Sequence, residues 1–441
     1  MARTPLAEAY PQQLRQAMAE LFPESLWMGV RRHGNAQWTP GRLLTAATLM
    51  SWDDAQTLRG RFHNAREVVS RMFPDEAPPS SYSGFAKALA GHAGELLPRV
   101  RRRLQEQLRC SGAGRWRTGR WVVFGADGSR FECPRTAANE AGLGCAGKNR
   151  TAPQAFHTML MHLRTGALWD FRVGPGTDSE RRHLEDMADG LPPQSLLVAD
   201  AGFIGYELCR RLQRSGVHFL LRVGGNITLL AEQLGGRVDR DGETVWLWPH
   251  KQRSGPPLVL RLLVVGRGAQ AVYLATDVHD VEQLSASEAA EFYRQRWGLE
   301  VAYRTIKQTL NRAVWLSRTP ETVLAEHVAT LLGAWTLQAL SFQQLRLAKQ
   351  DPRRWSPAQA RDATRRVLRL ALDRTATPQR TWLAQLGQSV GDRYVRRRPK
   401  RARDWPHKKR DPPTRPPNLK RLTKNQRQRG EILLKNATKK S

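Results

Sequence analysis

Four side chains near the centre of the chain have types and spacing suited to phosphate chemistry. They are Tyr293, Arg296, Glu300 and Lys307, at offsets of 3, 7 and 14 from the first. On a helix that turns about 100° per residue, all four fall within roughly 60° of arc. A helix face that combines a phenol, a guanidinium, a carboxylate and an ammonium differs from the apolar face of a core helix. It predicts one metal ligand, Glu300, beside three donors suited to phosphate oxygens.

Two aspartates complete a candidate site. Asp127 and Asp200 follow short apolar runs, residues 121–126 and 196–199, that predict buried strands. Each Asp alone is more often a turn former or helix cap, and Glu300 alone is most often a solvated helix residue. Together, carboxylates at two strand ends and one on a helix form an oxygen-rich site for hard cations. Two such ions about 3.5–4 Å apart can activate a nucleophile and stabilise a leaving oxygen. We therefore predict Asp127, Asp200 and Glu300 as a catalytic, metal-binding triad that cleaves phosphodiesters.

The charge of the chain indicates its partner. The net charge is +31, while a hydrophobic content of 40% with 14 Trp indicates a folded protein. Residues 396–441 hold 18 Lys and Arg against three acidic residues, a net of +15, so residues 1–395 still carry +16. A body and a tail that are both basic predict a polyanion, nucleic acid above all. An acidic membrane surface is the weaker alternative, because the most apolar run, about 328–342, is too short to span a bilayer and predicts a buried helix.

Cysteine usage and the N-terminal residues favour a cytoplasmic protein. The four cysteines form no CxxC pair, so the sequence predicts no zinc knuckle, and reduced thiols are expected. No apolar stretch follows a basic start at the N-terminus, so no signal peptide is predicted.

The order of apolar runs predicts the elements that position the site. Residues 1 to about 112 show helical spacing, with a helix start at Thr39-Pro40. Strand-like runs then alternate with short helices as far as about 223, which predicts an α/β core with a mixed sheet. A block of strands and turns follows, and then a long helix with a capping box at Ser285 and Glu288 carries the four-residue stripe. Two further helices complete the body, and the basic tail from about 394 is predicted to be disordered.

These motifs resemble those of the DDE transposases of bacterial insertion sequences, in particular the insertion-sequence-four family. That family is marked by Tyr-x2-Arg-x3-Glu-x6-Lys, which residues 293–307 match at all four places. The contexts Asp127-Gly128 and Asp200-Ala-Gly-Phe203 resemble its first two acidic motifs. The resemblance covers roughly residues 118–345.

The resemblance implies an α/β fold with a ribonuclease-H-like core, interrupted by a β-rich insertion between the second Asp and the Glu. The gap of 100 residues between Asp200 and Glu300 can hold such an insertion. The expected divisions are an N-terminal helical region that is a candidate for DNA binding (1–115), the first part of the core (116–224), the insertion (225–280), the second part of the core with the motif helix (281–349), a C-terminal helical region (350–393) and the tail (394–441).

The resemblance also implies roles for the residues. Asp127, Asp200 and Glu300 would bind two Mg²⁺ ions, for which Mn²⁺ can substitute. Tyr293, Arg296 and Lys307 would contact DNA phosphates near the transposon end, Arg by bidentate contact and Lys as a point charge. Simple solvent exposure is the alternative for the Arg and the Lys.

Trp246 and Trp248 are candidates for stacking on a flipped base, as an insertion-domain Trp does in some relatives. They lie two residues apart on a predicted strand and so share one face. Ordinary core packing remains the alternative for each residue.

The function implied is cut-and-paste DNA transposition. Hydrolysis at the element end releases a 3′-hydroxyl, which closes a hairpin with the other strand and, after hairpin opening, attacks target DNA. The partners would be terminal inverted repeats and target DNA, held by a homodimer of a bacterial, nucleoid-associated protein. Two alternatives remain, a nuclease on the same core without strand transfer and an inactive basic DNA-binding protein.

Overall fold

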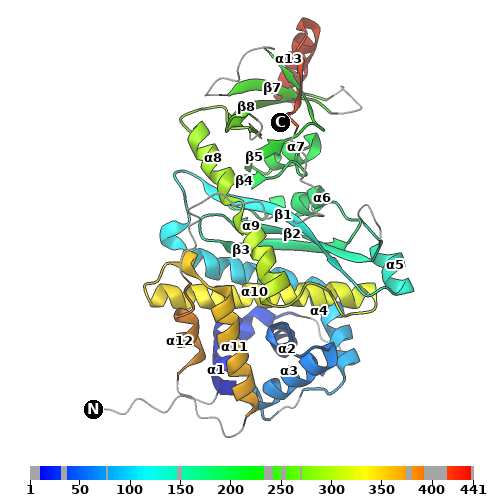
Figure 1. The fold of residues 1–441 in the computed structure, drawn as a ribbon, viewed down its shortest axis with the longest axis vertical. Coiled ribbons are helices and arrows are strands. Elements are labelled where there is room, and N and C mark those ends of the chain that lie inside the picture. Colours follow the sequence, from blue (N-terminus) through cyan, green and yellow to red (C-terminus); the bar gives the residue numbers. More distant parts are fainter. Residues whose placement is uncertain are drawn as a thin grey trace, which may run out of the picture.

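The computed structural model describes nine stretches of the chain and builds them into an elongated molecule (Figure 1). The stretches are residues 10–30, 37–75, 78–146, 151–232, 242–249, 255–268, 271–373, 380–391 and 415–438. Helices from both ends of the sequence form one end of the molecule, a twisted sheet forms the middle, and the last helix lies at the opposite end.

Ten strands of the described residues form a single mixed sheet. In chain order they are β1 (Val122–Glu132), β2 (Gln154–His162), β3 (Ala167–Pro175), β4 (Ser195–Ala199), β5 (His218–Val223), β6 (Thr228–Ala231), β7 (Glu243–Leu247), β8 (Leu258–Val265), β9 (Val272–Thr276) and β10 (Asn418–Arg421). Their order across the sheet is β10-β6-β7-β8-β9-β5-β4-β1-β2-β3. Strands β1, β4 and β5 run parallel to one another. Strand β2 pairs antiparallel with β1, and β3 pairs antiparallel with β2.

Helices cover both faces of the three parallel strands, which explains why these strands are apolar on both sides. One face packs on α6 (Glu180–Ala188) and α7 (Tyr206–Arg214), through Phe124 and Ala126 of β1. The other face packs on α9 (Gly298–Arg304) and its neighbours, through Val123. Because side chains alternate along a strand, Asp127 shares the face of Val123 and lies on the side of α9.

Strand β1 is longer than the sequence predicted. We expected Asp127 to end the strand, but β1 continues to Glu132 because β2 pairs with it throughout, as far as Gln154 opposite Glu132. Asp200 does follow the end of β4, as predicted. The parallel register sets Ala126 against Ala199, so the next residue on each strand is one of the two aspartates. The two carboxylates therefore start from neighbouring positions at the point where β4 stops.

The β-rich block after β5 continues the main sheet. Strand β9 pairs with β5, and β8, β7 and β6 follow as an antiparallel meander. The strands predicted in this block are present, but they extend the same sheet outward from the candidate site.

The N-terminal and C-terminal helices pack together. The helices of this layer are α1 (Tyr10–Leu21), α2 (Pro40–Trp52), α3 (Leu58–Met72), α4 (Tyr82–Ser111), α10 (Pro320–Leu347), α11 (Pro357–Leu372) and α12 (Trp382–Gly387). Thr39 caps α2, as its Thr-Pro sequence predicted. Helix α1 contacts α11 and α12, so the two helical regions that we expected to be separate share one core. The short α5 (Ala137–Leu143) lies beside β2 and β3.

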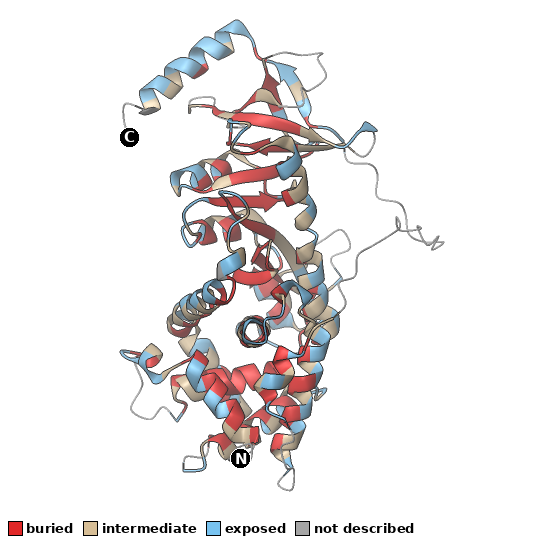
Figure 2. Cartoon of the chain, turned by 90° about the vertical axis from the view of Figure 1, so that its left-hand side faces the viewer, coloured by how far each residue is buried: buried red, intermediate tan, exposed pale blue. Residues whose placement is uncertain are grey.

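Helix α10 contains the most apolar run of the sequence. It is the one helix of the described residues that is long and apolar enough to cross a membrane, yet 78% of its most apolar window is buried inside the protein. It lies across α2 and α4, and Figure 2 shows buried residues, in red, in both this layer and the sheet. The prediction of a buried helix at 328–342 is confirmed.

The prediction of a disordered tail is wrong for part of its length. Strand β10 pairs parallel with β6, and α13 (Lys424–Thr438) follows it. The pairing with β6 supplies the backbone hydrogen bonds that a basic segment could not make alone. Residues 392–414 and 439–441 lie outside the described part of the chain.

Candidate active site at the end of two parallel strands

The two aspartates are held by their own backbone. Asp127 Oδ1 accepts a hydrogen bond from Gly128 N at 2.9 Å, and Asp200 Oδ1 accepts one from Ala201 N at 2.8 Å. Burial raises the pKa of Asp127 above its ordinary value, despite the nearby Arg296. Burial also raises the pKa of Asp200, but the Ala201 N–H and two arginines outweigh it, so that the pKa lies below its ordinary value.

The motif segment consists of two short α-helices followed by a π-helical turn. Helix α8 (Ala286–Gln295) begins with the predicted capping box between Ser285 and Glu288. A tight turn at Arg296 separates α8 from α9, and a π-helical turn over Thr305–Thr309 follows α9. The prediction of one regular long helix is therefore wrong in detail. Parts of the stripe still converge: Tyr293 and Arg296 contact Asp200, and Lys307 contacts Ser129 on β1.

Arg296 lies between the two aspartates. Its Nη1 is 3.8 Å from Asp127 Oδ2, and its Nη2 is 3.9 Å from Asp200 Oδ2. Only 7% of the residue is exposed, and its guanidinium carbon lies 5.4 Å from the centre of the Tyr293 ring. The guanidinium therefore neutralises the carboxylates from inside the site.

Tyr293 and Arg222 hold Asp200 from its other side. The Tyr293 hydroxyl donates to Asp200 Oδ1 at 3.2 Å, and Arg222 Nη1 donates to the same oxygen at 3.2 Å. The sequence interpretation did not include Arg222, which lies on β5. Its position on the strand parallel to β4 brings it to the same sheet end, but only the register of the sheet shows this.

Glu300 is half-buried on α9, and its charge contributes to the raised pKa of Asp127. Glu300 is therefore near enough to Asp127 for its charge to act on that carboxyl group. Within the described stretches, however, no three His, Cys, Asp or Glu side chains are close enough together to hold a metal ion. The types of donor suit Mg²⁺, whose preferred ligands are carboxylate oxygens and water. For these side chains to hold the ion, Arg296 has to withdraw from between the aspartates.

The contacts of Lys307 are with other residues of the protein. Its Nζ donates to Ser129 Oγ at 2.8 Å and to the Arg130 carbonyl at 3.3 Å, and it lies 4.6 Å from the centre of the Phe131 ring. Burial lowers the pKa of this ammonium. The π-helical turn that carries Lys307 is thereby fastened to β1, two residues beyond Asp127.

A comparison with protein families finds a match to the part of the chain that carries this site. Residues 122–337 match the family described as the transposase DDE domain. The matched region is just under half of the 441-residue chain, and over this region the chain is similar to the DDE transposases. It contains both aspartates, the glutamate and the whole motif segment.

Two relatives can be named. The chain is 25% identical over 247 residues to the "Transposase InsG for insertion sequence element IS4" of Escherichia coli (strain K12), a match that covers 53% of this chain and 54% of that protein. The matched region thus spans about half the length of the curated relative. Among solved structures, the chain is similar to the piggyBac transposase synaptic complex with hairpin DNA, with a TM-score of 0.42 and 11% identity over 88% of this chain and 84% of that one.

Tyr303 of the transposase domain was not predicted as a site residue. Its hydroxyl donates to the main-chain carbonyl of Asp127 at 2.5 Å, and its ring stacks on His157. It follows Glu300 by three residues on α9, so one hydrogen bond ties the helix of Glu300 to the strand of Asp127. From the sequence alone, Tyr303 is indistinguishable from an ordinary core aromatic.

We expect Tyr303→Phe to weaken divalent-metal binding by about 10-fold, because loss of an outer hydrogen bond lets the two carboxylates drift apart. Calorimetric titration of the DNA-free protein with Mn²⁺ measures this. Tyr206→Phe is the matched control, since it removes a similar hydrogen bond to the Pro256 carbonyl outside the site. Equal Mn²⁺ affinity in the two variants would show that Tyr303 has no positioning role.

Glu180 at the start of α6 was also missed. Its carboxylate lies next to Gly202, where a Cβ would collide with Glu180 Oε1, and it also approaches Gly128. Burial raises the pKa of Glu180, and the charges of Asp127 and Asp200 raise it further. At Gly128 a Cβ would first meet the Phe156 ring, at 2.6 Å, so the ring is the main reason for glycine there.

The two candidate stacking residues differ in exposure. Trp246 is 4% exposed, and its ring packs against Gly430 of α13. Trp248 is half-buried and donates from Nε1 to the Gly255 carbonyl at 2.9 Å. The core-packing alternative describes Trp246 in this structure, because the C-terminal helix covers the face that a base would need.

A buried histidine pair lies behind the site. His157 of β2 and His327 of α10 hydrogen-bond through Nδ1 and Nε2, and both are 0% exposed. Burial lowers the pKa of His157 to about 3 and lowers that of His327 as well. His162, also buried, has its pKa lowered to about 4 for the same reason. All three rings are therefore neutral in the folded protein at neutral pH.

These histidines predict that stability falls with acidification below about pH 6.5. The unfolded chain then binds protons at these histidines and the folded chain does not. This lowers the free energy of unfolding by about 1 kcal/mol per histidine by pH 5.5. Urea unfolding at pH 7.5 and 5.5 measures the difference. His63→Gln, which changes an exposed histidine, should leave it unaltered. Equal stability at the two pH values would contradict the prediction.

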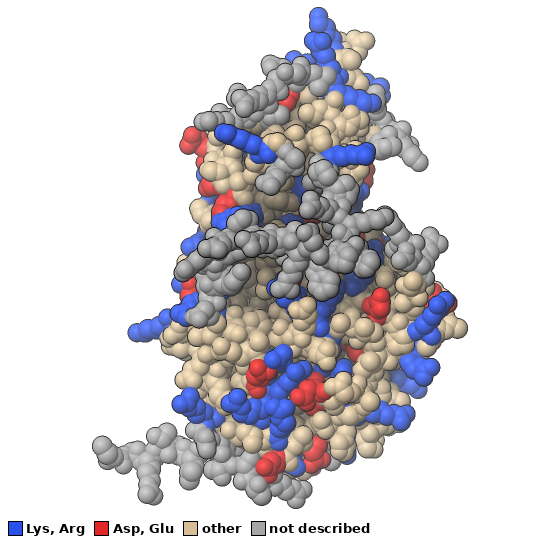
Figure 3. All heavy atoms as spheres, in the orientation of Figure 1, with Lys and Arg blue, Asp and Glu red and all other residues tan. Residues whose placement is uncertain are grey.

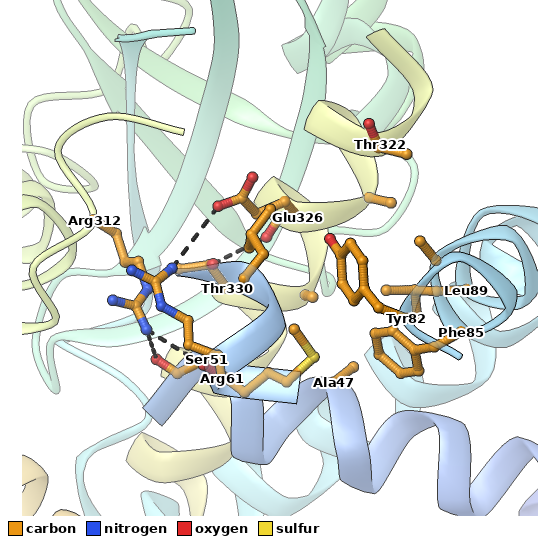
Figure 4. A pocket seen from close by; sticks show the side chains of 15 residues that line it. Ala47, Ser51, Arg61, Tyr82, Phe85, Leu89, Arg312, Thr322, Glu326 and Thr330 are labelled. Carbon is orange, nitrogen blue, oxygen red and sulfur yellow. Dashed lines mark hydrogen bonds and ion pairs between the residues drawn. The ribbon is translucent and has the colours of Figure 1, made fainter. Parts of the chain in front are cut away.

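Beyond the motif segment, Arg312 connects the site to the helical layer (Figure 4). This residue is 2% exposed, and its Nη2 donates to the carbonyls of Met50, Ser51 and Asp53 at the C-terminal end of α2. Nearby, Arg61 lies 3.9 Å from Glu326, beside a small cavity of about 40 Å³. The guanidinium satisfies carbonyls that have no partner within the helix, and its charge is favourable at that end of the helix dipole.

Proposed function

We propose that this protein is a DNA transposase that cuts the ends of an insertion sequence and joins them to target DNA. The observation that carries the proposal is the placement of Arg296 between Asp127 and Asp200, in a region that matches the transposase DDE domain. The Tyr293 hydroxyl on Asp200 and the charge of Glu300 acting on Asp127 support it. The strand order β3-β2-β1-β4-β5, with β1, β4 and β5 parallel, supports a ribonuclease-H-like core for that domain.

The roles of the side chains follow from their contacts. Asp127, Asp200 and Glu300 would hold two divalent ions, Mg²⁺ or Mn²⁺, which supply an activated water and stabilise the leaving oxygen. Arg296 and Tyr293 contact Asp200 in this structure. If that carboxylate held a metal ion, their N–H and O–H groups would be available as donors to a DNA phosphate. Lys307 contributes its third N–H and its positive charge from the edge of the site.

The reaction proceeds in two stages. A water oxygen bonds to phosphorus at the element end while the bond from phosphorus to the 3′ oxygen breaks, which leaves a 3′-hydroxyl and a 5′-phosphate. The 3′-hydroxyl then attacks a second phosphodiester, closing a hairpin on the opposite strand and, after hairpin opening, joining target DNA. We place the reaction in the bacterial cytoplasm, on nucleoid DNA, with a homodimer pairing two inverted repeats.

The proposal also assigns roles to two parts of the chain. We propose residues 122–337, with the strands β6–β9 as an extension, as the catalytic unit, and the combined helical layer as the candidate for reading the inverted repeats. A nuclease without strand transfer remains the second candidate, since the site residues are the same for both.

Incubation of the protein and Mg²⁺ with labelled DNA that carries the element end, together with a target plasmid, separates the two. The transposase reading requires covalent joining of the labelled end to the plasmid, visible as a labelled band of plasmid size. Cleavage without any joined product would support the nuclease, and neither product would leave a DNA-binding protein.

A further inference from the structure

The C-terminal strand and helix form a fixed part of the molecule. Strand β10 pairs with β6 from Asn418 opposite Thr228 to Arg421 opposite Ala231. Leu422 is buried in a small apolar cluster with Leu230 and Trp246. This unit, residues 415–438, therefore holds its side chains at defined positions at the far end of the sheet (Figure 1).

Helix α13 has one face on the sheet and one in solvent. The covered or half-covered positions follow helical spacing and are 426, 430, 433, 434 and 437. Gly430 marks the closest approach, because a Cβ there would collide with the Trp246 ring. The opposite side is exposed along most of the helix (Figure 2).

The exposed side of α13 is basic. Lys424 and Lys435 fall within roughly 20° of arc on it, and we call these two residues the basic face. Arg427 is also exposed, but it forms an ion pair with Glu232 and is not counted in this face. Lys424 and Lys435 lie nearly in line, about 16 Å apart along the axis. The whole unit has seven basic residues and one acidic residue, Glu431. Figure 3 shows Lys and Arg side chains at this end of the molecule.

A simpler explanation covers only part of this charge. Strand β10 is the edge of the sheet, and Lys420 and Arg421 on it are suited to prevent edge-to-edge pairing with another chain. Helix α13 is not an edge strand, so this reason does not extend to its basic face. Solubility does not require it either, because the chain already carries +31.

The partner follows from the chemistry of the unit. Residues 415–438 contain no Phe, Trp or Tyr, so they offer no stacking platform for single-stranded bases. The covered side of α13 packs on the sheet and is not available to enter a membrane, as an amphipathic membrane helix requires. Exposed Lys and Arg at fixed spacing on a helix suit the phosphate backbone of duplex DNA.

We propose that the basic face of α13 binds the backbone of double-stranded DNA, independently of sequence, at the far end of the sheet from the helical layer. The proposal rests on the proposed function, in which DNA is the substrate. It assigns the C-terminal unit a second contact with the same DNA molecule, or with the target, outside the catalytic site.

The test uses the full-length protein with the double substitution Lys424→Gln and Lys435→Gln. Affinity for a duplex without element ends is measured by fluorescence anisotropy between 0.05 and 0.3 M salt, roughly the range in which counterion release dominates. Each lost phosphate contact should lower the slope of log K against log salt by about 0.9 and weaken binding about 8-fold at 0.1 M. The control is Arg182→Gln with Arg214→Gln, two exposed cations on α6 and α7, outside both the C-terminal unit and the helical layer.

A slope that falls by more in the α13 variant than in the control variant supports the proposal, and equal slopes overturn it. A second variant, Gly430→Leu, keeps every charge but displaces α13 from Trp246. It should also lower the slope of log K against log salt. If that slope is unchanged, DNA binding by these charges does not depend on the docked position of α13, and the proposal is wrong. Circular dichroism confirms folding of each variant.

Failure here is distinguishable from failure of the proposed function. Duplex binding is measured without chemistry, while strand joining is scored on end-containing DNA. Joining activity with an unchanged salt slope in the α13 variant would reject only the surface. Salt-dependent binding through α13 with no cleavage would retain the surface and reject the transposase.

Discussion

Asp200→Asn should reduce DNA cleavage on the order of 10³-fold while leaving the fold and duplex binding close to normal. The amide keeps the shape of the side chain, and its oxygen still accepts from Ala201 N. It removes the negative charge that Arg222 and Arg296 neutralise and that a divalent ion requires. Cleavage of labelled end DNA in Mg²⁺ measures the loss.

Asp189→Asn provides the matched control for this substitution. Asp189 lies at the end of α6, is exposed and pairs with Arg211, away from the candidate site. We expect it to retain full cleavage. If Asp200→Asn cleaves within 10-fold of the unchanged protein, Asp200 is not part of the catalytic set and the triad is wrong.

Arg312→Met should lower the free energy of unfolding by about 3–5 kcal/mol, the range found when a buried charge network loses one member. Met fills much of the volume, so the loss comes from the carbonyls of Met50, Ser51 and Asp53 left without a donor. The sulfur of Met also cannot offset the buried charge of Glu326 nearby. Denaturant titration at pH 7.5 measures the change.

The matched control is Arg366→Met on the exposed side of α11, which should cost less than about 0.5 kcal/mol. A loss below 1 kcal/mol for Arg312→Met would contradict its role as the bridge between α2 and the segment after the motif. Arg312→Lys should fall between the two, because an ammonium cannot reach all three carbonyls in the geometry of a guanidinium.

Local sequence patterns predicted the start of the motif helix and the chemistry of its stripe. Ser285 and Glu288 form the capping box through interactions within four residues, so no distant part of the chain is needed to specify it. The apolar run before Asp200 likewise predicted a strand that ends there. Patterns of this range depend on local propensity and periodicity, which the sequence contains directly.

Other features of the site depend on partners that are distant in sequence. Strand β1 continues past Asp127 because β2 pairs with it, and Arg222 reaches Asp200 because β5 lies beside β4. The π-helical turn moves Lys307 onto Ser129 and away from the regular helical position. Each of these results from strand register or packing, which periodicity does not encode.

The C-terminal tail shows the same division. Its high charge and low apolar content predict disorder, because such a segment cannot bury enough apolar surface alone. In the structure its strand β10 pairs with β6 and its helix α13 packs against Trp246. The insertion strands thus supply the apolar surface that the tail lacks. Trp246 is consequently unavailable as a stacking platform while α13 is in place.

The sequence by itself determined the types of side chain proposed for the chemistry, their order along the chain and the family that their motif resembles. Those are properties of spacing within short segments. Only the tertiary structure decided that Arg296 lies between Asp127 and Asp200, that Tyr303 ties α9 to β1, and that the tail is docked. The physical reason is that register and packing free energies arise between segments far apart in the chain, so they exist only once the sheet has formed.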